Sequence, residues 1–376
     1  MVTGAVVRGW CPDAWRPMKA GDGLLVRVRP PLDRLTRAQA LGLCKAAIRH
    51  GNGEIDLTTR ANLQIRGVRE DRWPALVDAL LALGLIDPDP VREARANIVV
   101  AADWRAGDNT HRIATDLRRR LSELPDLPGK VGYAIDAGTA PADFRIERAV
   151  TGGLILRADG RERGIPLAQG TEVDRLIALA HWFVDTGGIA SGRVVRHVAP
   201  LPDWATGTTR PATFAAPIPP GEHPIGVAIG LPFGRVSAPA LAFLLKAEPA
   251  IQAIRTTPWH VLLCEADGPL ISIPAPADFL LDASSPLLRV DACVGALACP
   301  QATVDTRDLA RRLVPHVTGR LHVSGCAKGC ARAASADVVL TGRDGYYDLA
   351  ENARAGAPPS RASLDAAQVL AHFGAA

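Results

Sequence analysis

Four cysteines in the last third of the chain are the residues best suited to chemistry. Cys293 and Cys299 are separated by five residues and Cys326 and Cys330 by three, with glycine and alanine close to each cysteine. Zinc sites more often use pairs separated by two to four residues and often include histidine, whereas four thiolates among small residues suit a bulky iron–sulfur cubane. The pattern predicts a 4Fe–4S cluster and a redox function. A zinc site and four buried structural cysteines are the alternatives.

Arginines on predicted strands form the second group. Val26 and Val28 alternate with Arg27 and Arg29, so both guanidinium groups leave the face opposite to the valines. A later strand has a similar polar face, and the second half of the chain adds one arginine; these residues are Arg60, Asn62, Gln64, Arg66 and Arg255. Because an arginine fork binds a carboxylate at two points, this face predicts a ligand with several carboxylates. A solvated outer surface is the alternative.

Other residues give weaker signals. Cys44 and Cys264 fall on a predicted helix and a predicted strand, where core packing is expected, while Cys11 lies in a loop that could approach the site. The nine histidines show no metal-binding spacing, and His260 and His322 are expected to pack on strands. No Gly-x-Gly-x-x-Gly motif follows a strand, so a built-in NADH site is not predicted.

Composition and charge narrow the class of protein. The 376 residues are 48% hydrophobic and 22% charged, which is ordinary for a folded protein of two or three domains. The sequence has no apolar run long enough for a membrane span and no signal-peptide core, which predicts a cytoplasmic protein without membrane segments. The net charge of +4 is spread without basic blocks, so a small acidic ligand is expected and a nucleic acid is not.

The predicted elements that position these residues occur twice in the sequence. Residues 21–36 and 221–237 share an outline, an alternating strand, a proline and a Thr or Ser that can cap a following helix. TDLRRRL at 115–121 likewise matches RDLARRL at 307–313. Matching segments in the same order predict a tandem duplication with a site between the halves, and chance similarity is the alternative. The predicted domains are 1–88, 89–199, 200–285 and 286–376.

Several motifs resemble the sulfite and nitrite reductase superfamily. They are DLTTRANLQIRG at 56–67, LPGKVGYAID at 127–136, the two cysteine pairs and ADVVLTGRDGYYDL at 336–349. The resemblance covers nearly the whole chain and implies an α+β fold, in which two ferredoxin-like half-domains and two mixed α/β domains are related by pseudo-twofold symmetry. It also implies a 4Fe–4S cluster joined to sirohaem through one cysteine, which Cys330 matches. Arg60 and Lys130 match anion-binding cations, but Ala96 and Gly132 stand where the reductases carry an arginine and a lysine.

Within that superfamily, CPDAWRPMKAGDGLLVRVRP at 11–30 and SGCAKGCA at 324–331 resemble the precorrin-3B synthase family. This resemblance implies an O2-dependent hydroxylation of precorrin-3A at ring carbon C20, with a lactone formed from the ring A acetate, in aerobic cobalamin biosynthesis. It further implies a mononuclear non-haem iron and electrons that come ultimately from NADH through a separate reductase or ferredoxin. One alternative is a sirohaem-dependent sulfite or nitrite reductase. Another is an electron carrier or tetrapyrrole-binding protein without catalysis.

The same resemblance implies that precorrin-3A, a polycarboxylate tetrapyrrole, lies where the reductases hold sirohaem. The predicted metal ligands are Cys293, Cys299, Cys326 and Cys330. The predicted substrate-binding residues are Arg27, Arg29, Arg60, Gln64, Arg66, Lys130, Arg255 and Lys328. Lys328 and Arg332 flank the last cysteine pair, so each could instead raise the cluster potential. No catalytic residue is predicted.

Overall fold

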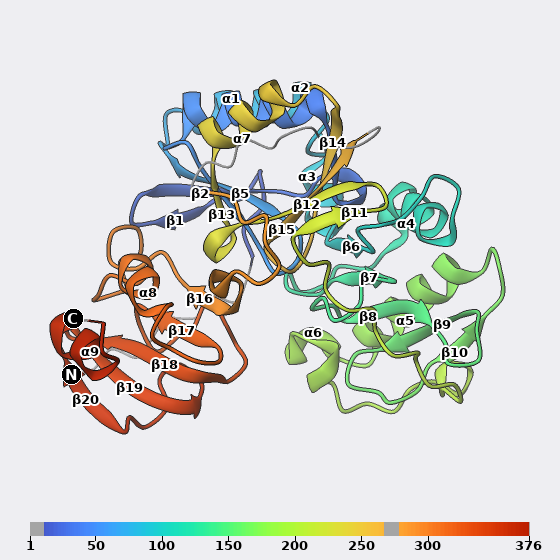
Figure 1. Ribbon diagram of the computed structural model, residues 1–376. Coiled ribbons are helices and arrows are strands. Elements are labelled where there is room, and N and C mark those ends of the chain that lie inside the picture. Colours follow the sequence, from blue (N-terminus) through green and yellow to red (C-terminus); the bar gives the residue numbers. More distant parts are fainter. Residues whose placement is uncertain (1–10, 267–277, 376) are drawn as a thin grey trace.

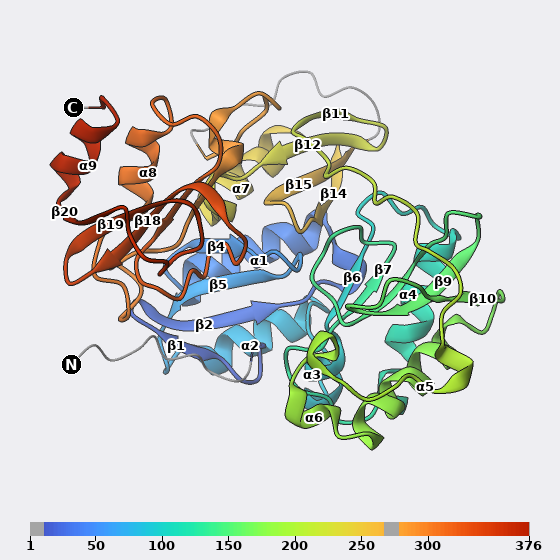
Figure 2. The ribbon, with the colours of Figure 1, turned by 90° about the horizontal axis from the view of Figure 1, so that it is seen from below.

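Four five-stranded sheets organise the protein, which is a computed structural model that describes residues 11–266 and 278–375. Two antiparallel sheets lie together beneath three helices, and two mixed sheets hang below them as separate lobes (Figure 1). Seen from below, the same two lobes flank the central sheets (Figure 2). No helix in the described ranges is long and apolar enough to cross a bilayer.

The two antiparallel sheets exchange an edge strand. The first has the order β1-β2-β5-β4-β13 and the second β11-β12-β15-β14-β3. Val236 of β13 pairs with Ile55 of the first sheet, and Leu35 of β3 pairs with Ile254 of the second. The strands are β1 (Met18–Ala20), β2 (Gly23–Val28), β3 (Arg34–Thr36), β4 (Glu54–Leu57), β5 (Leu63–Val68), β11 (Gly221–His223), β12 (Gly226–Gly230), β13 (Arg235–Ser237), β14 (Ile251–Thr256) and β15 (Val261–Ala266).

Helices α1 (Arg37–His50), α2 (Trp73–Ala82) and α7 (Ala238–Ala247) cover one face of this pair of sheets (Figure 1). As predicted, the side chains of Thr36 and Ser237 cap α1 and α7 by accepting backbone N–H groups three residues later. Apolar residues from both copies form one core. We therefore propose that the predicted domains 1–88 and 200–285 form one unit rather than two.

The two antiparallel sheets and the helices α1, α2 and α7 together form what we call the antiparallel module. The predicted core cysteines lie in this module. Cys44 of α1 and Cys264 of β15 are both fully buried within the shared core. Burial raises the pKa of each thiol to about 12. Both cysteines are therefore protonated packing residues, as the sequence predicts, and are distinct in role from the other cysteines.

The two mixed sheets have the same topology. In each sheet three parallel strands are followed by two antiparallel ones, in the orders β6-β7-β8-β9-β10 and β16-β17-β18-β19-β20. The first sheet contains β6 (Ile98–Val100), β7 (Tyr133–Ile135), β8 (Phe144–Arg148), β9 (Leu154–Ala158) and β10 (Ile165–Leu167). The second contains β16 (Val290–Ala292), β17 (Leu321–Ser324), β18 (Ala336–Arg343), β19 (Tyr346–Ala353) and β20 (Arg361–Leu364). The repeated order confirms the predicted duplicated fold class.

Helices pack on these mixed sheets and complete each core. The first lobe has α3 (Pro90–Arg95), α4 (Asn109–Arg119), α5 (Glu172–Asp185) and α6 (Gly188–Ser191), and the second has α8 (Arg307–Leu313) and α9 (Ala366–His372). Each lobe encloses its own apolar cluster. The two lobes thus have equivalent sheets and separate cores, so the loops at their edges can carry different functional residues.

Candidate functional site

The four cysteines of the predicted metal site lie at one edge of the last sheet. Cys293 follows β16 and Cys326 follows β17, and because these strands are parallel neighbours, both cysteines leave the same edge. All four are free thiols. Burial raises the pKa of the Cys330 thiol, the adjacent Lys328 opposes this, and the other three cysteines raise it further. The influence of the other three cysteines on Cys330 shows that the fold brings all four thiols to one region of this edge, although among the described residues they do not form a preformed metal-ligand group.

The surroundings of these thiols fit a 4Fe–4S cluster. The Gly325 backbone N–H donates to Cys293 Sγ across 3.2 Å, an N–H···S bond of the kind that tunes such clusters. A Cβ at Gly325 would lie 2.4 Å from the Ala302 Cβ, so only glycine keeps this loop so close. Thr306 Oγ1 donates to the Cys293 carbonyl across 2.6 Å and fixes the loop from the other side. Four thiol ligands and small neighbours form the donor set that such a cluster uses.

The first half of the chain holds this cysteine loop in place. The Gly21 N–H donates to the Ala298 carbonyl across 3.1 Å, one residue before Cys299. A Cβ at Gly21 would lie 3.0 Å from the Ala298 carbonyl carbon, so the two loops are in close backbone contact. The position of the cysteines therefore depends on the β1–β2 turn of the antiparallel module.

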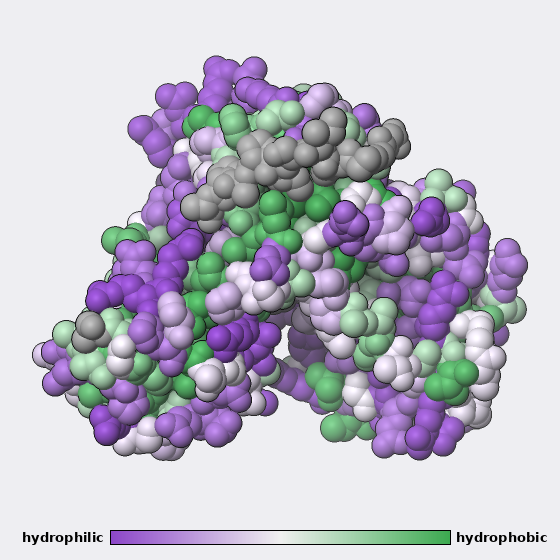
Figure 3. Space-filling view, in the orientation of Figure 1, coloured by the Kyte–Doolittle hydropathy of each residue, from purple (hydrophilic) through white to green (hydrophobic). Residues whose placement is uncertain are grey.

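A cavity of about 690 Å³ opens beside Cys330. Its polar wall includes Asp291, Arg320 and Arg332, and both arginines are ion-paired with Asp291, at 3.1 and 3.5 Å. Its apolar wall is formed by Trp259, the proline run 217–220 and neighbouring leucines, while Thr59 joins from the first half. Figure 3 shows the molecule hollowed between the two lobes. Several hundred cubic ångströms is the size range of pockets for large organic ligands.

Two arginines predicted to bind substrate instead hold protein groups. Arg29 is 5% exposed and pairs with Glu93 at 3.3 Å, and its other contacts are backbone carbonyls. Arg255 pairs with Glu265, donates to the carbonyls of Ala102 and Trp104, and lies 4.2 Å from the Trp104 ring centroid. These acceptors use most of the guanidinium donors, and only Nε of Arg29 is left without a partner among the described residues. We therefore interpret both residues as structural rather than as the substrate ligands that strand alternation predicts.

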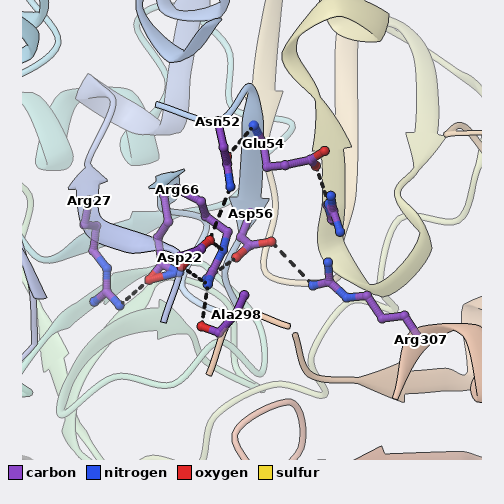
Figure 4. Close-up of polar contacts among 10 residues, drawn as sticks. Asp22, Arg27, Asn52, Glu54, Asp56, Arg66, Ala298 and Arg307 are labelled. Carbon is purple, nitrogen blue, oxygen red and sulfur yellow. Dashed lines mark hydrogen bonds and ion pairs between the residues drawn. The ribbon is translucent and has the colours of Figure 1, made fainter. Parts of the chain in front are cut away.

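Arg66 is the third such correction. Its guanidinium binds Asp22 at 2.9 Å and Asp56 at 3.0 Å and reaches the Ala298 carbonyl at 3.4 Å (Figure 4). Arg307, on α8 of the cysteine-bearing lobe, approaches Asp56 from the other side at 3.5 Å. Burial lowers the pKa of Arg66, but the two carboxylates more than offset this, and the group stays charged. Arg66 thus joins the antiparallel module to the cysteine loop.

Arg27 and Arg60 differ from these three because, among the described residues, neither has an ion-pair partner, and each has a buried donor without an acceptor; Arg29 shares only the second feature, at its Nε. Arg27 donates to Gln64 Oε1 across 2.9 Å, but within the described structure its Nε and the Nη1 of Arg60 have no hydrogen-bond partner. Burial lowers the pKa of Arg27 to about 10, and Cys11, which contacts it, acts in the opposite direction. Burial also lowers the pKa of Arg60, and so does the neighbouring Arg193.

Of the two predicted lysines, Lys130 lies near these groups and Lys328 lies at the cysteines. A Cβ at Gly129, the residue before Lys130, would lie 3.8 Å from the Cys11 backbone nitrogen, which places the Lys130 loop beside the Cys11 loop. Lys328 is exposed between Cys326 and Cys330. Cys11 therefore lies beside Arg27 and Arg60, and a role for it in the site stays a prediction.

Comparison with known proteins places this arrangement in a family. Residues 16–83 match the model of the nitrite/sulfite reductase ferredoxin-like half domain. A precorrin-3B synthase from Sinorhizobium sp is 32% identical over 94% of this chain and 84% of its own length. The chain belongs to the precorrin-3B synthase family.

More distant relatives share the fold of this precorrin-3B synthase family member. A ferredoxin–nitrite reductase from Synechococcus elongatus is 24% identical over 89% of this chain and 78% of its own length. The solved NirA protein of Mycobacterium tuberculosis superposes with a TM-score of 0.59 at 18% identity, covering 92% of this chain and 78% of that one. The predicted superfamily resemblance is thereby confirmed.

The cavity of this family member also contains residues that the sequence alone did not single out. Thr58 and Thr257 occupy equivalent turns, because each Oγ1 accepts the N–H groups two and four residues later. Trp259 is then the counterpart of Arg60, and His260 the counterpart of Ala61, with φ angles of 58° and 56°. His260 lies in this turn, not on a strand as predicted, and both Trp259 and His260 line the cavity. Alignment of the two repeats was the signal that could have identified them.

A mononuclear iron has no ligand set in the described part of this family member. Within residues 11–266 and 278–375, no three His, Cys, Asp or Glu side chains form a group that could hold a metal ion, and this holds for the four cysteines too. The four cysteines match the donor set of a 4Fe–4S cluster by their chemistry, but no side chains are assigned to the mononuclear iron that the resemblance implies, and no role is given to it.

Proposed function

We propose that this protein is a precorrin-3B synthase that binds precorrin-3A in the cavity beside Cys330 and hydroxylates its ring carbon C20. One oxygen atom of O2 enters the substrate, and the other leaves as water. The reaction consumes two electrons and two protons, and the ring A acetate closes the lactone. NADH is the ultimate electron source, acting through a separate reductase or ferredoxin. A 4Fe–4S cluster held by Cys293, Cys299, Cys326 and Cys330 would supply single electrons at the wall of the cavity.

The observation that carries the proposal is that Arg27 and Arg60 combine an unsatisfied buried guanidinium donor with the lack of any ion-pair partner among the described residues, whereas Arg29 and Arg307 are ion-paired. A buried donor without an acceptor destabilises a protein by about 1–3 kcal/mol, more when it is charged. Thr59, the neighbour of Arg60, lines the cavity, so a ligand there can reach this cationic group. Substrate carboxylates are the acceptors that would satisfy both arginines. Lys130 and Gln64, beside them, complete the proposed binding set.

The apolar wall suits the other part of the same ligand. A tetrapyrrole has a flat, largely apolar ring and an acidic rim, and Trp259 and the proline run 217–220 offer flat apolar surfaces. Arg320 and Arg332 stand on the cavity wall next to Cys330 and can meet carboxylates on that side. The exposed Lys328 is a further candidate at this end.

Two positions favour this reaction over the alternative of a sirohaem-dependent reductase. A Cβ at Gly132 would lie 2.7 Å from the Asn97 side-chain nitrogen, so a lysine there would displace an amide that donates to Val131 across 2.8 Å. Ala96 is 4% exposed and belongs to the core of the first lobe, where an arginine would be buried. Both absent cations would face a small dianion in the reductases, so this site is better matched to a larger substrate.

Binding and single turnover test the proposal. Anaerobic titration with precorrin-3A should show binding, and reduced protein given O2 should convert the bound pigment to the lactone in one turnover. Arg60→Ala should raise the Kd roughly tenfold to a hundredfold, because a charge-assisted hydrogen bond is lost. Arg69→Ala, in an exposed ion pair with Asp71, is the matched control and should bind like wild type. A protein purified with tightly bound sirohaem, seen as a Soret band, would instead support the reductase.

Metal analysis tests the cysteine assignment separately. Cys326→Ser and Cys330→Ser should lower the iron content and abolish the EPR signal of the reduced cluster. Cys264→Ser is the control, since Cys264 is a core residue far from solvent. A full signal in Cys326→Ser and Cys330→Ser proteins would remove these residues from the ligand set.

A further inference from the structure

His322 is a buried histidine whose ring has no partner. It is 0% exposed, and neither Nδ1 nor Nε2 has a hydrogen-bond partner among the described residues. A neutral imidazole carries one N–H donor and one acceptor, and burying them unpaired destabilises a protein by about 1–3 kcal/mol. Nearly all buried polar groups are paired, so this ring points to an acceptor that the protein chain does not supply.

The strand places the ring beneath the last cysteine pair. Leu321 and Val323 of β17 belong to the core of the lobe, so His322 and Ser324 lie on the opposite face of the strand. On that face the chain turns back over the strand. A Cβ at Gly329 would lie 3.6 Å from His322 Cε1, and Gly329 has a φ of 62°. The imidazole therefore lies under the residue that precedes Cys330.

The surroundings offer the ring no other strong acceptor. Its in-register neighbours are Asp291 on β16 and Val339 on β18. Asp291 already accepts from Arg320 across 3.1 Å and is ion-paired with Arg332, and it faces the cavity that Cys330 lines. No hydrogen bond joins its carboxylate to the imidazole in the described structure. The direction left open is toward the loop of Cys326 and Cys330.

We propose that His322 donates a ring N–H hydrogen bond to a sulfur atom at the Cys330 corner of the cluster and so stabilises its reduced form. The inference rests on the proposed 4Fe–4S cluster. An N–H donor at sulfur offsets the negative charge gained on reduction and raises the potential. Gly325 already gives Cys293 such a donor from the backbone. His322 would be the side-chain equivalent at the corner that faces the cavity and is thus a positioning residue for electron delivery.

An EPR-monitored redox titration of the full-length, cluster-loaded protein tests this. His322→Leu should make reduction of the cluster about tenfold less favourable, a shift of about 59 mV to lower potential for one electron. His322→Gln keeps an N–H donor and should fall nearer to wild type. His316→Leu is the matched control, because His316 is an exposed histidine of the same lobe and its loss should leave the potential unchanged.

Pulsed EPR on wild-type protein labelled with [15N]histidine decides the case even where a variant loses its cluster. A nitrogen-15 coupling in the reduced state is expected, and its absence would overturn the proposal. A wild-type potential in His322→Leu at full cluster occupancy would overturn it as well. Failure of the wild-type protein to bind any cluster would instead refute the proposed function, so the two failures are distinguishable.

Discussion

Replacing Arg66 with methionine should loosen the contact between the antiparallel module and the cysteine loop. The change keeps much of the side-chain length but leaves Asp22 and Asp56 without the guanidinium that binds them at 2.9 and 3.0 Å. Removing one partner of a buried ion pair destabilises a protein by about 3–5 kcal/mol, because the remaining charge stays buried. The two carboxylates here are 14% and 13% exposed, so the low end, about 3 kcal/mol, is expected.

Hydrogen exchange with mass spectrometry measures this locally. A loss of about 3 kcal/mol in opening free energy corresponds to a rise in exchange rate on the order of a hundredfold. The rise should be confined to β2, β4, β5 and the loop at 293–299, which Arg66 contacts through the Ala298 carbonyl. The assay does not require the whole chain to unfold in one step.

Two variants separate the buried network from charge in general. Arg69→Met removes an exposed pair whose side chains are 75% and 55% exposed, and its effect should stay below about 1 kcal/mol. Arg66→Lys keeps the charge but loses the fork that reaches both carboxylates, so an intermediate loss is expected. Unchanged protection of β5 and of the 293–299 loop in Arg66→Met would refute the reasoning. Asp22 and Asp56 would then be shown to remain buried without an arginine partner at no cost in stability.

Two further predictions concern single substitutions, one in the cysteine loop and one at a buried carboxyl group. Gly325→Ala should displace the cysteine loop and weaken the bond to Cys293 Sγ, because the added Cβ would lie 2.4 Å from the Ala302 Cβ, and iron content after reconstitution should fall; full iron loading would contradict this. Asp33 is 2% exposed, and burial raises its pKa well above the usual value despite the N–H donated by Val100. The folded state favours the protonated form of Asp33. The contribution of Asp33 to the stability of the protein is therefore greatest at low pH and is lost as the pH rises through its folded pKa. Asp33→Asn should therefore raise the urea midpoint at pH 8 more than at pH 5, and an equal change at both would contradict it.

Local signals predicted the elements of this fold but not which sheets some of them join. Thr36 and Ser237 cap their helices as predicted, because capping depends on a side chain and a backbone group three residues away. The exchange of β3 and β13 was not predicted. Each is a three-residue edge strand with one buried valine or leucine, compatible with either sheet, and its partner is selected by packing between the two copies.

Contacts between distant parts of the sequence also explain why some predicted site residues have other roles. Strand alternation correctly separates the face that carries Arg27 and Arg66 from the core face, but it cannot show what covers that face. Arg66 meets Asp22 from a turn 44 residues away in sequence, and Arg255 meets the backbone of Ala102 from a distance of 153 residues. Only the tertiary fold brings these acceptors next to the arginines. The sequence alone therefore cannot show which arginines are already hydrogen-bonded by protein groups and which can bind a ligand.

Duplication followed by divergence accounts for a cavity with two different walls. At equivalent turns, the first copy carries Arg60 and the second carries Trp259. The pseudo-twofold frame therefore gives one copy a cation next to the lining residue Thr59 where the other copy has an aromatic ring on the cavity wall. The last lobe adds Cys330 to the wall, while the equivalent first lobe has no cysteine after β6. A symmetric ligand would gain nothing from this difference. A ligand with an acidic rim and an apolar ring, whose reaction needs electrons from one side, uses all three features at once, and the asymmetry is therefore the part of the structure most specific to the proposed substrate.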